Sequence, residues 1–274
     1  MRIKTALRKK MSKLVRVLKG LKSVVIAYSG GVDSAFLLQA ACDALGRENV
    51  LAVTAVSETF PAQEARDARM FVIKKKIRFL EIRTRELANR SFAKNGVKRC
   101  YYCKKELFGR LESIRAETGF GAVADGTNYD DLLDMRYGRL AKKEFKVVSP
   151  LESARMSKSD IRALSKKMGL PTHDKPSFAC LASRIPYGTA VTRKKLKTLD
   201  AAETALKNMG LRQVRVRHHG DMARIEVYEG EIRKVASDRY RRAITLCLRK
   251  LGFRYVTVDL AGYRTGSMNP AGGK

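Results

Sequence analysis

The sequence predicts an α/β fold, a doubly wound parallel sheet followed by a smaller C-terminal α+β domain. The first observation is that apolar, β-rich runs alternate with helical patterns through the first half of the chain. The second is a glycine-rich turn directly after the first of these runs. The third is a change after Pro186, where the order of elements becomes α-β-β-α-β. We therefore expect two domains, residues 1–185 and 186–274.

The expected strands of the first domain are short and apolar, which is typical of strands buried on both faces. They comprise residues 24–27, 50–57, 77–84, 122–125 and 145–150, with helices at residues 64–76, 104–117 and 157–168. Ser157 is a suitable N-cap for the last of these helices, with Asp160 three residues on. In such sheets, ligands bind beyond the carboxyl ends of the strands, where the strand order reverses. We expect the loop at residues 29–34 and the segment ADGTNYDD, residues 124–131, to meet there.

The segment VVIAYSGGVDS, residues 24–34, predicts an anion-binding turn. A buried strand leads into Ser29, Gly30 and Gly31, and an apolar helix follows. Unpaired N–H groups and the positive end of the helix dipole point at such a turn, and its glycines let phosphate oxygens approach the backbone. No Lys-Ser or Lys-Thr pair follows, so the turn is not a Walker A sequence. The carboxylate of Asp33 is placed to hold Mg²⁺ against bound phosphates.

The second domain offers a different anion site. Its expected elements are helices at residues 194–209 and 231–250 and strands at residues 213–218, 223–228 and 254–260. In the first strand, Val214 and Val216 share one face while Arg215 and Arg217 share the other. Two guanidinium groups on a rigid strand suit recognition of phosphate or carboxylate. The spacing alone leaves open the alternative of an ordinary solvated strand face.

The chain of 274 residues carries a formal net charge of +30. This excess attracts polyanions, so RNA is a candidate partner; the alternative is a nucleotide enzyme from a host whose proteins are generally basic. Residues 1–22 hold nine Lys or Arg and no acid, with leucines at helical spacing, which predicts an amphipathic helix with a basic outer face. No apolar run approaches the roughly 20 residues that span a bilayer, and the N-terminus lacks a signal-peptide core. We expect a cytoplasmic protein without a membrane partner.

Five cysteines, an odd number, argue against a disulfide framework. Cys100 and Cys103 open a helical pattern at a spacing that places both thiols on one face. Cys180 lies in a loop-like stretch between the two domains. Three thiolates could hold an iron–sulfur cluster with one iron open, or zinc with His173 as fourth ligand, or remain plain or redox-active thiols. The other two cysteines are expected to be small core residues, Cys42 and Cys247.

Two resemblances to known protein families indicate which kind of enzyme this chain is expected to be. The string SGGVDS resembles the pyrophosphate loop of the PP-loop ATP pyrophosphatases, which have the adenine nucleotide alpha hydrolase-like fold and adenylate an oxygen that a nucleophile displaces. The segments DGTNYDDLLDMRYGRLA, ACLASRIPYG, RVRHHGDMARIEV and GFRYVTVDLAGYRTGSMN resemble the LarE family in collinear order. The resemblance runs over residues 24–269. It implies an ATP-dependent sulfur transferase that converts pyridinium-3,5-biscarboxylic acid mononucleotide to the thiocarboxylate, for the nickel-pincer cofactor of lactate racemase.

The LarE resemblance also implies a sulfur source. Cys180 matches the family's sulfur-donating cysteine, which surrenders its sulfur and becomes dehydroalanine in members that have it alone. Members with an additional Cys-x-x-Cys pair resemble enzymes that hold a [4Fe-4S] cluster, whose open iron carries a replaceable hydrosulfide. Because Cys100 and Cys103 are present, we expect the cluster type, replenished by a sulfide donor, with sacrificial donation by Cys180 as the alternative. The family also forms higher homo-oligomers.

The remaining site residues receive expected roles in this reaction. Ser29, Gly30, Gly31, Asp33 and Ser34 would hold the β- and γ-phosphates of ATP with Mg²⁺, and Asp125, Thr127 and Asn128 would frame the nucleotide. Arg184 would lower the pKa of a thiol or bind a substrate carboxylate. Arg215 and Arg217 would bind the mononucleotide phosphate, with Glu203 near the substrate or a metal. Arg136 and Asp134 would contact the substrate or form a loop salt bridge.

Two other functions remain open. A tRNA-thiolating PP-loop enzyme would share the loop, the three cysteines and the basic surface, although no recognised tRNA-binding module follows. A non-catalytic nucleic-acid-binding protein with a nucleotide-sensing fold is the third alternative. The C-terminal third follows the LarE pattern, so a nucleic-acid partner is not expected, although the charge does not exclude it.

Overall fold

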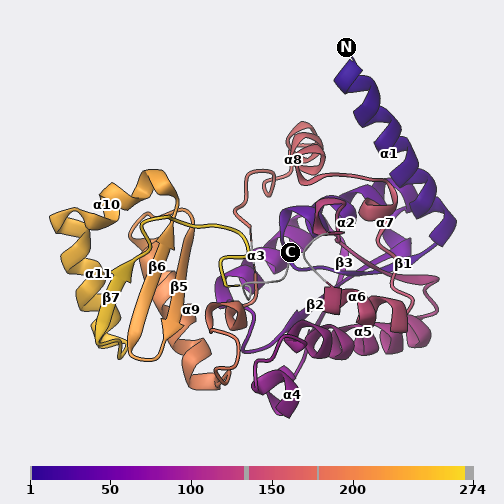
Figure 1. Cartoon of the computed structure of the whole chain (residues 1–274). Coiled ribbons are helices and arrows are strands. Elements are labelled where there is room, and N and C mark those ends of the chain that lie inside the picture. Colours follow the sequence, from indigo (N-terminus) through magenta and orange to yellow (C-terminus); the bar gives the residue numbers. More distant parts are fainter. Residues whose placement is uncertain (1, 133–135, 178, 269–274) are drawn as a thin grey trace. The chain divides into compact units, whose positions relative to one another are not determined.

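The computed structural model describes residues 2–132, 136–177 and 179–268, and it divides into two compact units. Unit 1 comprises residues 1–57, 64–86 and 100–178, and unit 2 comprises residues 58–63, 87–99 and 179–274. Figure 1 shows the helices and strands of both units. Within the described residues, no helix is long and apolar enough to cross a membrane.

Unit 1 contains the expected parallel sheet (Figure 1). Its strands are β1 (Val24–Ala27), β2 (Val50–Val56), β3 (Arg78–Arg83) and β4 (Ala122–Asp125), in the order β3-β2-β1-β4. The strand order reverses between β1 and β4, where Ala27 pairs with Asp125 in parallel register. The α/β prediction is therefore confirmed, with the reversal point at the end of β1. The expected strand at residues 145–150 contributes only an isolated bridge, from Val148 to Ala124.

Helices cover both faces of this sheet, and its central strands β1 and β2 are apolar and mostly buried. The helices of unit 1 are α1 (Arg2–Leu21), α2 (Val32–Leu45), α3 (Ala62–Lys74), α5 (Arg99–Thr118), α6 (Arg136–Glu144), α7 (Pro150–Ser153) and α8 (Lys158–Lys167). Val24 and Ile26 join a core cluster with α1, α2 and α8, whereas Val25 joins one with α5. The predicted capping box at the start of α8 is also confirmed, since Ser157 and Asp160 bond each other's backbone N–H.

Unit 2 is built on a three-stranded sheet in the order β5-β6-β7. Its main elements are α4 (Arg90–Ala93), α9 (Arg193–Asn208), β5 (Val214–His219), β6 (Met222–Val227), α10 (Ile232–Ala236), α11 (Asp238–Lys250) and β7 (Tyr255–Val258). The hairpin β5-β6 is antiparallel and β7 pairs with β6 in parallel. The single helix expected at residues 231–250 is wrong, because the backbone at Ser237 is extended and separates α10 from α11. The solvated-face alternative for β5 is also wrong, since Arg215 and Arg217 are buried.

Candidate functional site

The loop after β1 has the geometry of an anion site. Gly30 has a φ of +70°, and a Cβ there would lie 2.8 Å from the Cβ of Ala68, so only glycine fits. Gly31 precedes α2 without a side-chain cap, so the first N–H groups of that helix have no side-chain partner at the cap position. The hydroxyls of Ser29 and Ser34 lie 3.1 Å apart across the loop. The expected loop residues are therefore brought together.

Two lysines from distant parts of the chain contact the loop and its neighbours. The Nζ of Lys158, at the start of α8, lies 3.0 Å from Oδ2 of Asp33. The Nζ of Lys175 donates to the carbonyl of Gly30 at 3.2 Å and lies 2.7 Å from Oε2 of Glu64. Sequence reasoning missed both lysines, because they follow the loop by more than a hundred residues and only the fold returns them to it.

The carboxyl end of β4 lies against the same loop. A Cβ on Gly126 would meet the backbone nitrogen of Ser34 at 3.0 Å, which shows how close the two segments run. The buried Asp125 carboxylate accepts hydrogen bonds from the Thr127 hydroxyl at 2.7 Å and from the Ser149 hydroxyl at 2.6 Å. The expected convergence of the two segments is thus observed within unit 1.

The turn after β4 adds a second carboxylate. Asn128 is fully buried, and its Oδ1 accepts from the backbone N–H of Asp130 at 2.8 Å, so it shapes the turn. Burial raises the pKa of Asp131, and the nearby Asp33 carboxylate raises it further. Oδ1 of Asp33 is buried and has no hydrogen-bond partner among the residues that the structure describes. Two carboxylates that repel one another, one with an unused oxygen, fit a hard divalent cation such as Mg²⁺.

In unit 2, Arg184 and Glu203 form a buried ion pair. Nε and Nη2 of Arg184 donate to the two carboxylate oxygens of Glu203 at 2.8 and 3.0 Å. Burial alone would raise the pKa of Glu203, but the Arg184 charge and hydrogen bonds hold it below its usual value. Nη1 of Arg184 also donates to the carbonyls of Ala179 at 2.6 Å and Cys180 at 3.0 Å. Arg184 therefore fixes the backbone around the predicted sulfur donor.

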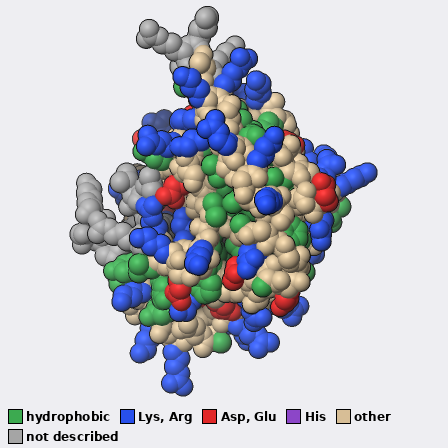
Figure 2. All heavy atoms as spheres, turned by 90° about the vertical axis from the view of Figure 1, so that its right-hand side faces the viewer, with side chains coloured by type: hydrophobic (Ala, Val, Ile, Leu, Met, Phe, Trp, Pro, Cys, Tyr) green, Lys and Arg blue, Asp and Glu red, His purple; other side chains and the backbone are tan. Residues whose placement is uncertain are grey.

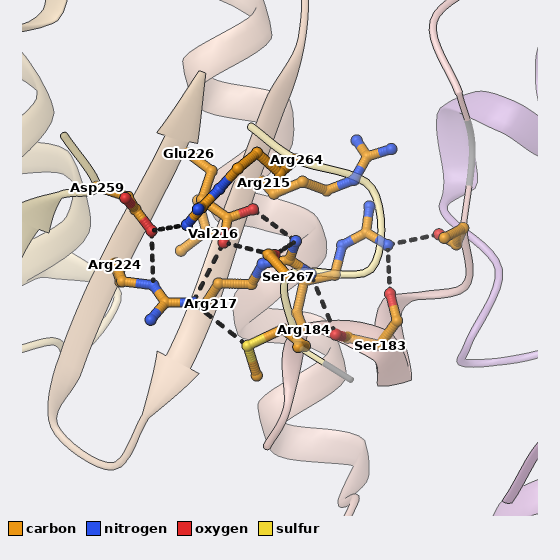
Figure 3. Close-up of polar contacts among 12 residues, drawn as sticks. Ser183, Arg184, Arg215, Val216, Arg217, Arg224, Glu226, Asp259, Arg264 and Ser267 are labelled. Atoms are coloured by element: carbon orange, nitrogen blue, oxygen red, sulfur yellow. Dashed lines mark hydrogen bonds and ion pairs between the residues drawn. The ribbon is translucent and has the colours of Figure 1, made fainter. Parts of the chain in front are cut away.

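The face of β5 and β6 beside this pair is rich in guanidinium groups (Figure 3). Nη2 of Arg217 lies 2.5 Å from Oε2 of the fully buried Glu226 and 3.0 Å from the hydroxyl of Ser267. The Arg215 guanidinium lies over the ring of Tyr263. Burial lowers the pKa of Arg215, and so does the Arg184 charge.

Cations outnumber anions in this group of unit 2 side chains. Its members are the five guanidiniums of Arg184, Arg215, Arg217, Arg224 and Arg264 and the three carboxylates of Glu203, Glu226 and Asp259. Three of these guanidiniums, Arg184, Arg215 and Arg217, are buried beside only two buried carboxylates, Glu203 and Glu226. Within the described residues, the buried Nε of Arg217 has no hydrogen-bond partner. This excess of buried positive charge favours an anionic ligand.

Within the described residues, none of the five cysteines forms a disulfide. Cys100 and Cys103 lie on the first turn of α5 in unit 1, and Sγ of Cys103 is 4.0 Å from Oε1 of Glu86. Cys180 belongs to unit 2. Among the described residues, no group of three or more His, Cys, Asp or Glu side chains is placed to hold a metal ion. Joint ligation by the three cysteines therefore stays a prediction.

The other predicted site residues are placed as follows. Cys42 is buried on α2, which raises the pKa of its thiol to about 11, as suits a core residue. Cys247 is half-buried on α11. Nδ1 of His173 lies 3.0 Å from the carbonyl of Leu170. Asp134 lies outside the described residues, and Arg136 begins α6 with its side chain outside them.

Comparisons with known proteins identify the family. A family model described as NAD synthase matches residues 2–105, which include the anion-binding loop. An uncharacterized protein of Synechocystis sp. is 39% identical over 96% of this chain and 98% of its own length. Pyridinium-3,5-bisthiocarboxylic acid mononucleotide synthase of Lactiplantibacillus plantarum is 40% identical over 95% of this chain and 94% of its own length. The chain belongs to the LarE family.

Membership of the LarE family makes this chain an enzyme of the ATP-using PP-loop superfamily, a sulfur transferase. The LarE match extends over both units, whereas NH(3)-dependent NAD(+) synthetase of Chlorobaculum tepidum is 29% identical over only 59% of the chain. The loop of Ser29–Ser34 lies within the residues that the NAD synthase model matches. The guanidinium-rich face of unit 2 lies beyond the residues that the NAD synthase model matches.

Proposed function

We propose that this enzyme uses ATP to adenylate a carboxylate of pyridinium-3,5-biscarboxylic acid mononucleotide and replaces AMP by sulfur. The product is the thiocarboxylate required for the nickel-pincer cofactor of lactate racemase. The observation that carries the proposal is the match along almost the whole chain to a relative named as the synthase of the bisthiocarboxylic acid mononucleotide. Both anion sites agree with it, since one suits a triphosphate and the other suits a phosphorylated substrate.

The adenylation half of the reaction is assigned to unit 1. Backbone N–H groups of the loop at Ser29–Ser34 would bind the β- and γ-phosphates. Lys158 and Lys175 would turn from their carboxylate partners to the phosphates, adding positive charge as pyrophosphate leaves. Asp33, with Asp131, would hold Mg²⁺, which neutralises charge on the leaving group. Asp125, Thr127 and Asn128 would frame the rest of the nucleotide.

The substrate half is assigned to unit 2. Arg215 and Arg217 would bind the mononucleotide phosphate, because they lie among surplus buried positive charge. Glu203 would act through Arg184, keeping it in place to hold the Cys180 backbone. Arg136 remains a proposed contact to a substrate carboxylate. Substituting Arg215 by Gln should raise KM for the mononucleotide by about 10-fold or more and leave KM for ATP unchanged.

Sulfur transfer begins with attack of a sulfur nucleophile on the acyl carbon of the adenylate. If the Cys180 thiolate attacks, a C–S bond forms, the C–O bond to AMP breaks and a thioester results. Removal of the Cα proton of Cys180 then breaks its Cβ–S bond, which releases the thiocarboxylate and leaves dehydroalanine. This sacrificial route is the alternative to our favoured one.

The favoured route uses a [4Fe-4S] cluster held by Cys100, Cys103 and Cys180. Three incompletely buried cysteines outside any disulfide are the soft donors that such a cluster needs. The cluster would supply a hydrosulfide that an external sulfide donor replaces, so that the protein survives each turnover. We also propose a cytoplasmic location, where thiols stay reduced, and the homo-oligomeric assembly expected for the family.

The decisive experiment measures pyrophosphate release from ATP with the mononucleotide, followed by anaerobic counts of iron and acid-labile sulfide. Substrate-dependent release supports the adenylation step, and its absence contradicts it. About four irons per chain, lost in Cys100→Ala together with multiple turnover, support the cluster. Iron-free protein that loses one sulfur at Cys180 after a single turnover supports sacrificial donation. Release that depends on tRNA instead of the mononucleotide supports the tRNA-thiolating alternative, which the basic charge favours.

A further inference from the structure

Helix α1 presents an exposed face rich in cations, with no acidic and no large apolar side chain. Five exposed side chains define it, and we call them the α1 basic face: Arg8, Lys9, Lys13, Arg16 and Lys19. At 100° per residue they fall within an arc of about 140° and extend along roughly 16 Å of helix. Figure 2 views unit 1 from the side of α1, and blue Lys and Arg side chains outnumber red acidic ones there.

The opposite face of α1 is fully used in the core. Leu14 and Leu18 are 0% exposed and pack with α2, and Met11 and Leu21 pack against the same cluster. The contact with an acid comes from Lys10, outside the α1 basic face, which pairs with Asp160 of α8. Among the described residues, no carboxylate pairs with the five cations. The core contacts of α1 therefore come from its opposite face, and the charges of the α1 basic face are not paired within the described residues.

The like charges of the α1 basic face repel one another, which destabilises the helix in the free protein. Lys9 and Lys13 are four residues apart, and Lys13 and Arg16 are three apart, so like charges are neighbours on the helix surface. An ordinary solvated helix mixes both signs on its exposed face and avoids this repulsion. The first turn of α1 also has no acidic residue to complement the helix dipole. A bound polyanion would relieve both effects.

The residue types of the α1 basic face indicate which kind of partner it would bind. An interfacial helix inserts apolar side chains into a bilayer, but those of α1 are packed against the core. A protein partner needs apolar or aromatic anchors at the centre of the contact, and the arc between Arg8 and Lys13 has none. Phosphate groups of a nucleic acid require only cations and small donors. We propose that the α1 basic face binds the phosphate backbone of a nucleic acid, independently of the sulfur-transfer site.

The test is the salt dependence of binding to a fluorescent single-stranded RNA of about 20 nucleotides, by anisotropy between about 50 and 200 mM KCl. The full chain should bind with a linear fall of log affinity against log salt. The variant Arg8→Gln/Lys9→Gln/Lys13→Gln/Arg16→Gln should bind at least about 10-fold more weakly and have a slope smaller by about 3, since each lost contact removes about 0.7. Glutamine keeps helix propensity, and the charge-conserving Lys9→Arg/Lys13→Arg variant should bind as the parent does.

A matched control removes the same charge from α11, in the variant Arg239→Gln/Arg242→Gln/Arg249→Gln/Lys250→Gln, whose side chains are also exposed. A loss of RNA affinity in the α1 variant but not in the α11 variant supports the proposal. Equal loss in both variants overturns it in favour of a diffuse charge effect. Unchanged binding in the α1 variant overturns it as well. An α1 variant that loses binding to phosphatidylserine vesicles but keeps RNA binding overturns it in favour of a membrane surface.

Discussion

Arg184 and Glu203 form a two-pronged ion pair with 1% and 4% of their side chains exposed. A buried pair of this kind adds little net stability, but each partner alone is costly because its charge stays desolvated. Here the pair has a further consequence, since the third nitrogen of Arg184 holds the carbonyl of Cys180. The position of the predicted sulfur donor thus depends on a carboxylate 23 residues further along the chain.

Substituting one partner of this pair should destabilise unit 2. Glu203→Gln leaves the Arg184 charge buried, and we expect a loss of about 3 kcal/mol in the free energy of unfolding, measured by urea denaturation. The double variant Arg184→Met/Glu203→Leu should recover much of the loss, because no charge remains to be desolvated. A double variant no more stable than Glu203→Gln would show that the pair itself, and not the orphaned charge, supplies the stability.

The same pair predicts a dependence of stability on pH. Burial raises the pKa of Glu203, but Arg184 lowers it more, so the pKa in the folded protein lies below the value of about 4.3 in the unfolded chain. The contribution of the ionised carboxylate is therefore complete above about pH 4.3 and is lost as the pH falls through the folded pKa. Urea midpoints between about pH 6 and pH 3 should fall more steeply in the parent than in Glu203→Gln. Parallel curves would contradict this assignment.

Lys158 should matter for ATP and not for folding. Its side chain is 35% exposed beside Asp33, so the substitution removes an ion pair that contributes little to stability. If it moves to the triphosphate, Lys158→Gln should lower kcat/KM for ATP by about 10- to 100-fold, the usual effect of removing a charged hydrogen bond. Lys166→Gln, on the exposed side of the same helix, is the matched control and should leave kcat/KM unchanged. Equal effects in the two variants would contradict the role of Lys158.

Much of unit 1 could be predicted because local patterns determine it. The strand at Val24–Ala27 is apolar on both faces, the glycines that follow permit only a tight turn, and Ser157 with Asp160 is a complete capping signal. The convergence of the loop at Ser29–Ser34 with the carboxyl end of β4 also followed, since parallel strands end at one edge of the sheet. These conclusions needed only periodicity and one topological rule.

The other parts of the candidate site depended on tertiary contacts, which no local sequence pattern predicts. Lys158 and Lys175 read as ordinary surface lysines until the fold places them beside Asp33 and Gly30. Likewise, alternation in β5 showed that Arg215 and Arg217 share a face, but not that Glu226 and Ser267 make it a buried ionic network. Charge can be buried only where distant partners meet, so its burial cannot be deduced from spacing.

Gly30 offers the sharpest test of the anion-binding loop. In Gly30→Ala, the new Cβ would lie 2.8 Å from the Cβ of Ala68 on α3, and alanine at a φ of +70° costs about 1–2 kcal/mol in addition. The loop must shift, so we expect ATP binding to be lost, as measured by isothermal titration, with stability lowered by at least about 1 kcal/mol. Gly20→Ala is the matched control, because its Cβ meets nothing within 4 Å and helix α1 should gain about 0.5 kcal/mol. Adding Ala68→Gly to Gly30→Ala relieves the clash but not the backbone strain, so ATP binding should return only in part. Full ATP binding by Gly30→Ala alone would show that the loop does not contact the phosphates.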